Sequence, residues 1–406
     1  MKVWIKMLAA AGVGIAVGAY IGPESIFMEP LRVIGMLFFK LMSFMVLPLL
    51  LFSAVRSALY LRQNRRLFLV MVKSLGCFLL LSAIGATIGV VLGDVLEPGI
   101  GTDIEQIESP AVIQYPGTSR FILGIVPGSL LEFLRSGYAV LGVLFVAFLL
   151  AAAIILAKQE AREFHALVNS IDNTLHRLNL IILEFLPLGV AAYIGYIMGD
   201  MTVEALMPYL KLVLVVAAGV FIQVFIVQAL LVYFLTGINP FKFIHALLTA
   251  GMLGYVFGNR YTAYPVLAEN MEHNLGADRE VFTFAAGLGT TFSLSGSALV
   301  SGIAVMFVSQ VYGLDLSVYL QVIIVLLITA TTLKMDGLGQ GSIVILSVIL
   351  SHIVRLPAEG YALVLGISSL IYQIETAANV MGNAAVSYIM SYSEKAVSGT
   401  SIRDFL

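Results

Sequence analysis

The sequence predicts an all-α integral membrane protein with re-entrant helical hairpins, and three observations predict it. Of the 406 residues, 60% are hydrophobic and only 11% are charged, whereas soluble domains have about 45–50% apolar and about 25% charged residues. Apolar stretches long enough to cross a bilayer recur along the chain. In the second half, polar and glycine-rich segments interrupt these stretches in a repeated order.

The first half contains six fairly continuous apolar stretches, and each predicts a transmembrane helix because roughly 20 helical residues cross the hydrocarbon core. Irregular residues 125–137 precede the fourth stretch. Lys2 and Lys6 precede the first stretch, but no convincing cleavage site follows, so we expect a retained helix rather than a signal peptide. The six stretches are residues 7–20, 33–54, 67–95, 140–156, 180–198 and 210–235.

Charge is distributed unevenly between the two sides of the membrane. If the spans alternate, acidic residues 97–108, Asp200 and Glu204 fall on one side and most basic residues on the other. Because Lys and Arg are enriched in cytoplasmic loops, this predicts cytoplasmic termini in a bacterial-type inner (plasma) membrane. The basic side carries Lys2, Lys6, residues 62–66, Lys158, Arg162, Arg177, Lys242, Lys395 and Arg403.

The remaining composition excludes several kinds of partner and site. The formal net charge is −2 without a cluster of Lys and Arg, so we expect no nucleic-acid partner. The single cysteine, Cys77, lies in an apolar stretch, which excludes a disulfide framework and a thiolate metal site. The five histidines lack metal-ligand spacing, and no zinc motif, serine–histidine pattern or aspartate dyad predicts an enzyme. We therefore expect no metal and no cofactor.

The second half repeats one order of segments: a short apolar piece, a polar break, another piece, and a long helix with an interruption. The first copy has its break at residues 258–265 and its interruption at residues 290–298; the second has them at residues 334–341 and 375–384. Half-length segments cannot expose backbone groups to lipid, so each break predicts the tip of a re-entrant hairpin. The alternative is an extramembrane loop between short helices. A repeated pair of hairpins predicts inverted repeats around a binding site at the membrane midplane.

Four segments resemble the dicarboxylate/amino acid:cation symporter family, the glutamate transporter homologues. Residues 38–57, 181–192, 287–299 and 363–383 resemble its second, fifth, seventh and eighth helices. The resemblance implies eight transmembrane helices plus two re-entrant hairpins, a homotrimer, and elevator-type movement. It also implies mainly scaffold and trimerisation helices in residues 1–237, with helices three and six moving with the transport unit. The transport core would be residues 238–394, and a cytoplasmic tail would follow at 395–406.

The chain departs from the family where the family binds sodium. The family's seventh helix carries Asn-Met-Asp-Gly-Thr, whereas residues 293–297 read Ser-Leu-Ser-Gly-Ser, so Ser295 replaces the acidic residue. Asn383 stands where the family usually has a sodium-ligating aspartate. In the third helix, Phe78 replaces a tyrosine of another sodium site, and Ser82 is retained. Because sodium in a low-dielectric site needs compensating negative charge, these losses predict weak or no sodium dependence, with protons or simple facilitation as alternatives.

Three further polar residues bear on coupling. Lys334, at the second hairpin tip where the family has glycine, would take the place of a mobile cation, or it would snorkel to the water interface. Asp336 would be an ion-site residue or simply the exposed neighbour of Lys334. Ser293 falls at the interrupted helix, where we favour a site role over packing.

The substrate positions have changed as well. In acidic amino acid transporters of the family, an arginine on the eighth helix binds the side-chain carboxylate and an aspartate a turn earlier binds the amino group; these positions are Glu375 and Tyr372 here, so the charge is reversed. Arg260 lies where some prokaryotic members have arginine, and guanidinium suits carboxylate binding. The expected substrate-binding set is Arg260, Thr262, Ser297, Tyr372, Glu375, Thr376 and Asn379.

Glu375 is an ionisable residue within a membrane helix, which marks a functional position by default. It would form an ion pair with Arg260 or Lys334, bind the amino group of a substrate, or carry a proton. The leading hypothesis is a secondary active or facilitative transporter of a small polar organic solute, an amino acid or related carboxylate. The alternatives are a sodium-coupled acidic amino acid or dicarboxylate symporter and a transport-dead channel or sensor.

Overall fold

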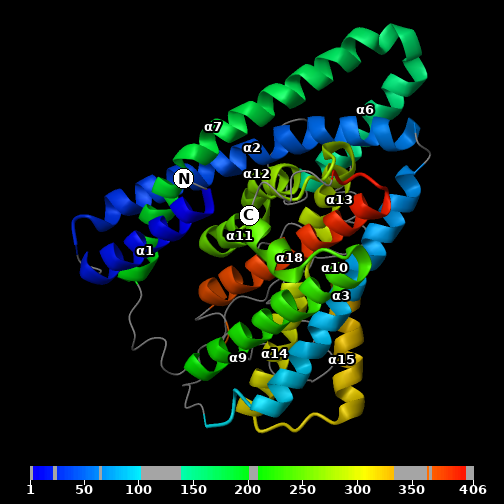
Figure 1. Ribbon diagram of the computed structural model, residues 1–406. Helices are drawn as coiled ribbons and strands as arrows, with labels where there is room; N and C mark the ends of the chain where they lie inside the picture. Colours follow the sequence, from blue (N-terminus) through cyan, green and yellow to red (C-terminus); the bar gives the residue numbers. More distant parts are fainter. Residues whose placement is uncertain are drawn as a thin grey trace.

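The computed structural model describes residues 3–21, 25–63, 66–101, 139–200, 209–332, 364 and 368–398. Every regular element in these ranges is helical, which confirms the all-α prediction for this part of the chain (Figure 1). Within the described ranges, five helical segments are long and apolar enough to cross a bilayer, and three shorter apolar helices accompany them. All six apolar stretches predicted in the first half lie within helices.

Long helices lie side by side along one flank of the molecule (Figure 1). Helix α7 packs along both α1 and α2, and α2 also packs against α6. A Cβ at Gly14 or Gly18 of α1 would collide with the backbone of α7, so glycine permits this close approach. The flank comprises α1 (Val3–Ile21), α2 (Met28–Gln63), α6 (Ala139–Ala157), the 3-10 turn η1 (Lys158–Ala161) and α7 (Arg162–Asp200).

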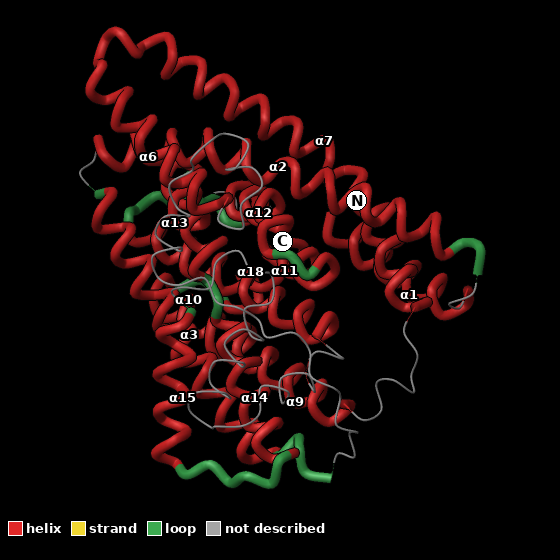
Figure 2. The backbone as a smooth tube through the Cα atoms, turned by 180° about the vertical axis from the view of Figure 1, so that it is seen from behind, coloured by secondary structure: helices red, strands yellow, loops and turns green. Residues whose placement is uncertain are grey.

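The other flank is built around the pairing of α3 (Leu67–Leu96) with α14 (Ser295–Val311), and α15 (Val318–Thr331) packs against both (Figure 2). A Cβ at Gly85 or Gly89 of α3 would collide with backbone oxygens of α14, and a Cβ at Gly302 of α14 would meet the backbone of α3. Reciprocal small residues therefore bring these two helices into backbone contact, as in many membrane helix pairs.

The sixth predicted span is one continuous helical segment that changes its winding. It consists of α9 (Leu210–Phe221), the π-helical η3 (Ile222–Gln228) and α10 (Ala229–Thr236). The π turn was not predicted. Such turns are rare and frequently mark functional sites. Gln223 and Gln228 of this turn are both buried in the protein interior.

Where the first hairpin was predicted, two helices are joined by a very short turn. Helix α11 (Pro240–Phe257) is followed by α12 (Arg260–Glu269) and the π turn η4 (Asn270–Asn274). The predicted break at residues 258–265 was too wide, because residues from Arg260 onward are helical. The side chain of Asn259 accepts the N–H groups of Tyr261 and Thr262 at 2.9 and 3.1 Å, and this cap starts α12 at once.

A long broken helix passes through the middle of the protein as α13 (Arg279–Phe292) followed by α14, and α18 (Ser368–Ser393) packs against both. Residues 293–309 are all buried. The interruption predicted at residues 290–298 is confirmed, although only two residues leave the helix. The interruption predicted at residues 375–384 is wrong, because α18 is helical throughout. Most of the second predicted hairpin, including Lys334 and Asp336, lies outside the described residues.

Candidate functional site

The break between α13 and α14 frees backbone groups in the protein interior. Ser293 (φ −80°, ψ 87°) and Leu294 (φ −120°, ψ 28°) leave the helical region after Phe292. Helix α14 then begins at Ser295, and its first backbone bond runs from the Ala298 N–H to the Leu294 oxygen at 2.8 Å. The N–H groups in this first turn need acceptors outside their own helix.

Asn379 of α18 supplies those acceptors. Its side-chain oxygen accepts the N–H groups of Gly296 at 2.8 Å and Ser297 at 3.3 Å, and its amide nitrogen donates to the Ser297 hydroxyl at 2.9 Å. The Asn379 backbone oxygen accepts the Ser293 hydroxyl at 2.8 Å. One buried asparagine therefore joins both sides of the break to α18, and three predicted site residues are brought together.

Glu375 lies one turn before Asn379 and has no exposed surface. Its Oε1 accepts the Ser297 hydroxyl at 3.2 Å, so this hydroxyl lies between the carboxylate and the Asn379 amide. A Cβ at Gly296 would collide with the Glu375 carbonyl oxygen, so glycine is what lets α14 approach α18 here. A carboxylate, a hydroxyl and an amide thus converge at the break, where a polar solute or a proton can be bound.

The tip of the first hairpin lies at the same end of α18. A Cβ at Gly258, whose φ of 55° favours glycine, would lie 3.3 Å from the Tyr372 ring. Arg260 follows Gly258 by two residues and is the first residue of α12. The Arg260 guanidinium also lies 5.1 Å from the centre of the Tyr261 ring. The predicted substrate residues of the hairpin and of α18 therefore share one region.

The two threonines of the predicted set are buried and engaged locally. The Thr376 hydroxyl donates to the Tyr372 backbone oxygen at 2.7 Å within α18. The N–H of Thr262 donates to the cap residue Asn259 at 3.1 Å. Both residues belong to the region, and the Thr376 oxygen keeps lone pairs that can still accept a hydrogen bond.

The positions where sodium ligands were expected to be missing are filled by protein groups. The Gln228 amide nitrogen donates to the Ser295 hydroxyl at 3.3 Å and to the Ala378 backbone oxygen at 3.2 Å. Asn383 donates to the Ala286 backbone oxygen at 3.0 Å and accepts the Ser387 hydroxyl at 3.1 Å. Ser295 and Asn383 are thus each bonded to protein groups, while the Gln228 side-chain oxygen has no hydrogen-bond partner among the described residues.

Phe78 and Ser82 of α3 complete this side of the site. A Cβ at Gly289 would collide with the Asn383 amide and lie 2.7 Å from the Phe78 ring, so ring and amide together fill the space beside Gly289. Ser82 is buried, and its hydroxyl has no hydrogen-bond partner among the residues that the structure describes. The phenyl ring of Phe78 carries no oxygen that could bind an ion at this place.

The two glutamines of the π turn were not predicted as site residues. The Gln223 amide donates to the Leu81 backbone oxygen at 3.2 Å, and Gln228 reaches the broken helix as described. An amide side chain within an apolar membrane span costs free energy unless it is hydrogen-bonded. The two glutamines in residues 210–235 could therefore have been predicted from the sequence to face the protein interior.

Comparison with known proteins decides the family. The model of the sodium:dicarboxylate symporter family matches residues 3–393. The chain belongs to this family. It is 28% identical to the proton/sodium-glutamate symport protein of Geobacillus stearothermophilus over 390 residues, and this alignment covers 93% of this chain and 91% of that protein. It is 26% identical over 408 residues to the proton/glutamate-aspartate symporter of Escherichia coli (strain K12), covering 96% and 92%.

A third relative is a carrier of a different solute. The C4-dicarboxylate transport protein 1 of Ralstonia nicotianae is 25% identical over 407 residues, which cover 98% of this chain and 94% of that protein. The family consists of symporters, so this chain is a membrane transporter protein rather than an enzyme, and the resemblance inferred from the helices is confirmed. These symporters move a small solute together with a cation.

Proposed function

We propose that this protein carries a small polar organic solute, an amino acid or related carboxylate, across a bacterial inner membrane by elevator-type alternating access. Residues 1–237 form mainly the scaffold of a homotrimer, with α3 and the α9–α10 segment attached to the moving part. Residues 238–394 form the transport core, residues 395–406 form a cytoplasmic tail, and both termini are cytoplasmic.

The observation that carries this proposal is the buried polar centre at the break between α13 and α14. Ser297, Glu375 and Asn379 are bonded to one another where helix ends meet, and the first hairpin tip adjoins them at Tyr372. Broken helices with polar groups in a membrane interior are the usual binding sites of secondary transporters. Arg260, Thr262, Tyr372 and Thr376 complete the proposed substrate site.

The relatives support a carboxylate-bearing solute. The names of three of them specify glutamate, aspartate or C4-dicarboxylates. Arg260 suits a carboxylate, while the buried Glu375 suits an ammonium group or a transferred proton. An amino acid offers both a carboxylate for Arg260 and an amino group for Glu375, whereas a dicarboxylate would offer its carboxylate to Arg260 and leave Glu375 to bind a proton.

Coupling to sodium is not part of the proposal. Ser295 is bonded to Gln228, Asn383 is bonded to Ala286 and Ser387, and Phe78 fills the adjoining space. None of these groups brings the formal negative charge that would offset the dehydration of sodium. We therefore propose that transport is coupled to protons, which Glu375 would bind and release, or that it is simple facilitated diffusion. Lys334 and Asp336, which lie outside the described residues, stay in the proposal as coupling positions.

Transport into liposomes that contain the purified protein tests the proposal. Labelled aspartate, glutamate and succinate are offered with sodium replaced by choline and with the pH gradient varied. We expect saturable uptake and counterflow that change little without sodium and respond to the pH gradient. Ser295→Asp restores an acidic residue beside Gln228 and should increase stimulation by sodium. Steep sodium dependence of the wild type would instead establish the sodium-coupled symporter, which the names of the relatives favour. Absence of counterflow would indicate a channel or a sensor.

A further inference from the structure

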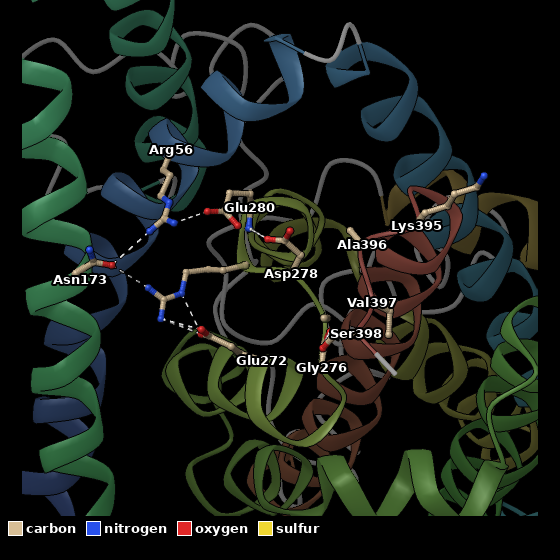
Figure 3. Close-up of a pocket in the computed structure, with 12 residues that line it drawn as sticks. Arg56, Asn173, Glu272, Gly276, Asp278, Glu280, Lys395, Ala396, Val397 and Ser398 are labelled. Carbon is tan, nitrogen blue, oxygen red and sulfur yellow. Dashed lines mark hydrogen bonds and ion pairs between the residues drawn. The ribbon is translucent and has the colours of Figure 1, made fainter. Parts of the chain in front are cut away.

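A cluster of charged side chains joins the two proposed parts of the protein at one end of the molecule. It borders a cavity of about 650 Å³, in which side chains from different helices face one another (Figure 3). We call it the junction cluster. Its members are Ser53 and Arg56 of α2, Asp172, Asn173 and His176 of α7, Glu269, Glu272 and His273 of α12 and η4, and Asp278, Arg279 and Glu280 at the start of α13.

Asp172 is the centre of the cluster. It has no exposed surface, and the Ser53 hydroxyl donates to it within the scaffold. Arg56 of the scaffold lies 3.3 Å from its carboxylate, and Arg279 of the core lies 3.6 Å from it. Arg56 also pairs with Glu280 of the core. Positive and negative groups therefore alternate across the boundary, and movement of the core along the scaffold has to separate them.

His176 crosses the same boundary with a different chemistry. Its Nε2 lies 3.1 Å from Glu272 and 3.4 Å from Glu269, and the residue is 6% exposed. Ionised carboxylates only accept hydrogen bonds. Nε2 makes no well-aligned hydrogen bond with residues in the part of the chain that the structure describes, so the contact at these distances is one of charge. A neutral ring presents either a bare nitrogen or a single N–H, whereas only the protonated ring places a positive charge opposite both carboxylates. The geometry thus fits an imidazolium that bridges α7 to the end of the first hairpin.

Other charged groups near His176 compete with it for the same carboxylates. Arg279 lies 2.9 Å from Glu272 and so competes for one carboxylate, while His273 lies 3.1 Å from Glu269 within the hairpin itself. Asp172, one turn earlier on α7, is engaged by the two arginines. Burial raises the pKa of the Glu272 carboxyl, but His176 and Arg279 outweigh burial and hold it at about 2. Glu272 therefore stays ionised near neutral pH, and the proton on His176 decides the strength of the contact.

We propose that His176 is a proton-binding site at the boundary and that its protonated form fastens the first hairpin to the scaffold. The proposal rests on the scaffold and core assignment made above. Acidification on this side, the cytoplasm in the proposed orientation, strengthens the contact and slows movement of the core; alkalinisation releases it. The site is separate from the polar centre at the helix break, so it regulates turnover without touching the solute.

Two histidine variants test the proposal. His176→Gln removes the titratable group, and His273→Gln is the matched control, because His273 contacts Glu269 within its own hairpin and does not cross the boundary. Counterflow is measured in liposomes with equal pH inside and outside. We expect wild-type exchange to be slower at about pH 6 than at about pH 8. His176→Gln should lose most of that difference and His273→Gln should keep it. Equal pH profiles for all three proteins would overturn the proposal.

A second readout needs no transport. The melting temperature of the detergent-purified protein should be higher at about pH 6 than at about pH 8, by about 2 °C more in the wild type than in His176→Gln. His273→Gln should behave as the wild type. Asp278 also titrates in this cavity, but it is present in both variants, so their comparison isolates His176. If His176→Gln does not fold, Glu269→Gln replaces it and should move the pH midpoint downward; an unmoved midpoint overturns the proposal.

The two readouts separate the two proposals. A pH-dependent melting difference without any solute exchange would support the proton site and contradict the proposed function. Saturable exchange together with identical pH dependence in the wild type and His176→Gln would support the function and overturn the proton site.

Discussion

At the scale of single residues, the negative charge of Glu375 can be removed by Glu375→Gln, which hardly changes the shape of the side chain. In Glu375→Gln an oxygen is kept that can accept the Ser297 hydroxyl. We therefore expect the melting temperature to change little, whereas solute affinity or its pH dependence changes, because a negative charge is lost from the polar centre. Affinity is measured by solute titration between about pH 5 and about pH 9.

The control for this variant lies directly after the end of the same helix. Glu394→Gln removes a carboxylate that contacts Arg66 at 2.6 Å, far from the helix break. Affinity should be normal in that control. A well-folded Glu375→Gln protein with wild-type affinity at every pH would show that Glu375 serves structure alone.

Asp278 gives a second prediction at this scale, with a defined direction in pH. Burial raises the pKa of its carboxyl to about 6, and neighbouring Glu280 contributes to the rise. The folded protein therefore holds a proton more tightly than the unfolded chain. This stabilisation is fully present below the unfolded pKa of about 4 and is lost as the pH rises from there through about 6. Asparagine is neutral at every pH and can still cap α13, as Asp278 does by accepting the Glu280 N–H at 3.1 Å.

Asp278→Asn should accordingly melt at the wild-type temperature at about pH 3, below the unfolded pKa, and at a higher temperature at about pH 8. Melting curves of both proteins at the two pH values measure this. A constant offset at both values would mean that the charge of Asp278 is not responsible.

At the scale of elements, the start of α12 is set by one side chain. Asn259→Ala removes the oxygen that accepts two N–H groups, which costs about 1 kcal/mol of stability. Because Arg260 follows directly, we also expect weaker solute binding. Thermal melting and solute titration measure the two effects.

Asn239→Ala is the matched variant, since Asn239 caps α11 in the same way, with bonds of 2.9 and 3.4 Å. It should lose similar stability and keep its affinity. Equal affinity losses in both variants would mean that the hairpin tip is no part of the solute site.

Not all interruptions could be predicted from the sequence. Small and polar residues run through both residues 290–298 and residues 375–384, yet only the first run breaks its helix. In α18 the polar side chains bond to neighbours instead: Asn379 caps α14 and Asn383 holds Ala286. A polar residue can interrupt its own helix or hydrogen-bond to a neighbouring helix, and which of these happens depends on the helix packed against it. The pattern of residues along the sequence does not say which helix that is.

At the scale of the whole molecule, composition was sufficient to predict a helical membrane protein, because 60% of the residues are apolar, whereas soluble domains have about 45–50% apolar residues. The junction cluster was not predicted. Its contacts join residues separated by 116 and 224 positions, as in Arg56 with Asp172 and with Glu280. Each residue by itself resembles an ordinary charge near a membrane interface, so the cluster exists only after the helices have packed.

That cluster allows the association of scaffold and core to be tested by charge reversal. Arg56→Glu places a third acidic group beside Asp172 and Glu280, and Glu280→Arg places a third basic group beside Arg56 and Arg279. Each single variant should cost about 2 kcal/mol of stability, between the values for exposed and buried pairs. In the double variant, restored attraction between positions 56 and 280 should recover part of the loss, and thermal melting of all four proteins gives the coupling.

Asp172 still faces the carboxylate introduced at position 56 in that double variant, so recovery is incomplete if the cluster acts as one unit. Strictly additive losses would mean that scaffold and core are held together elsewhere.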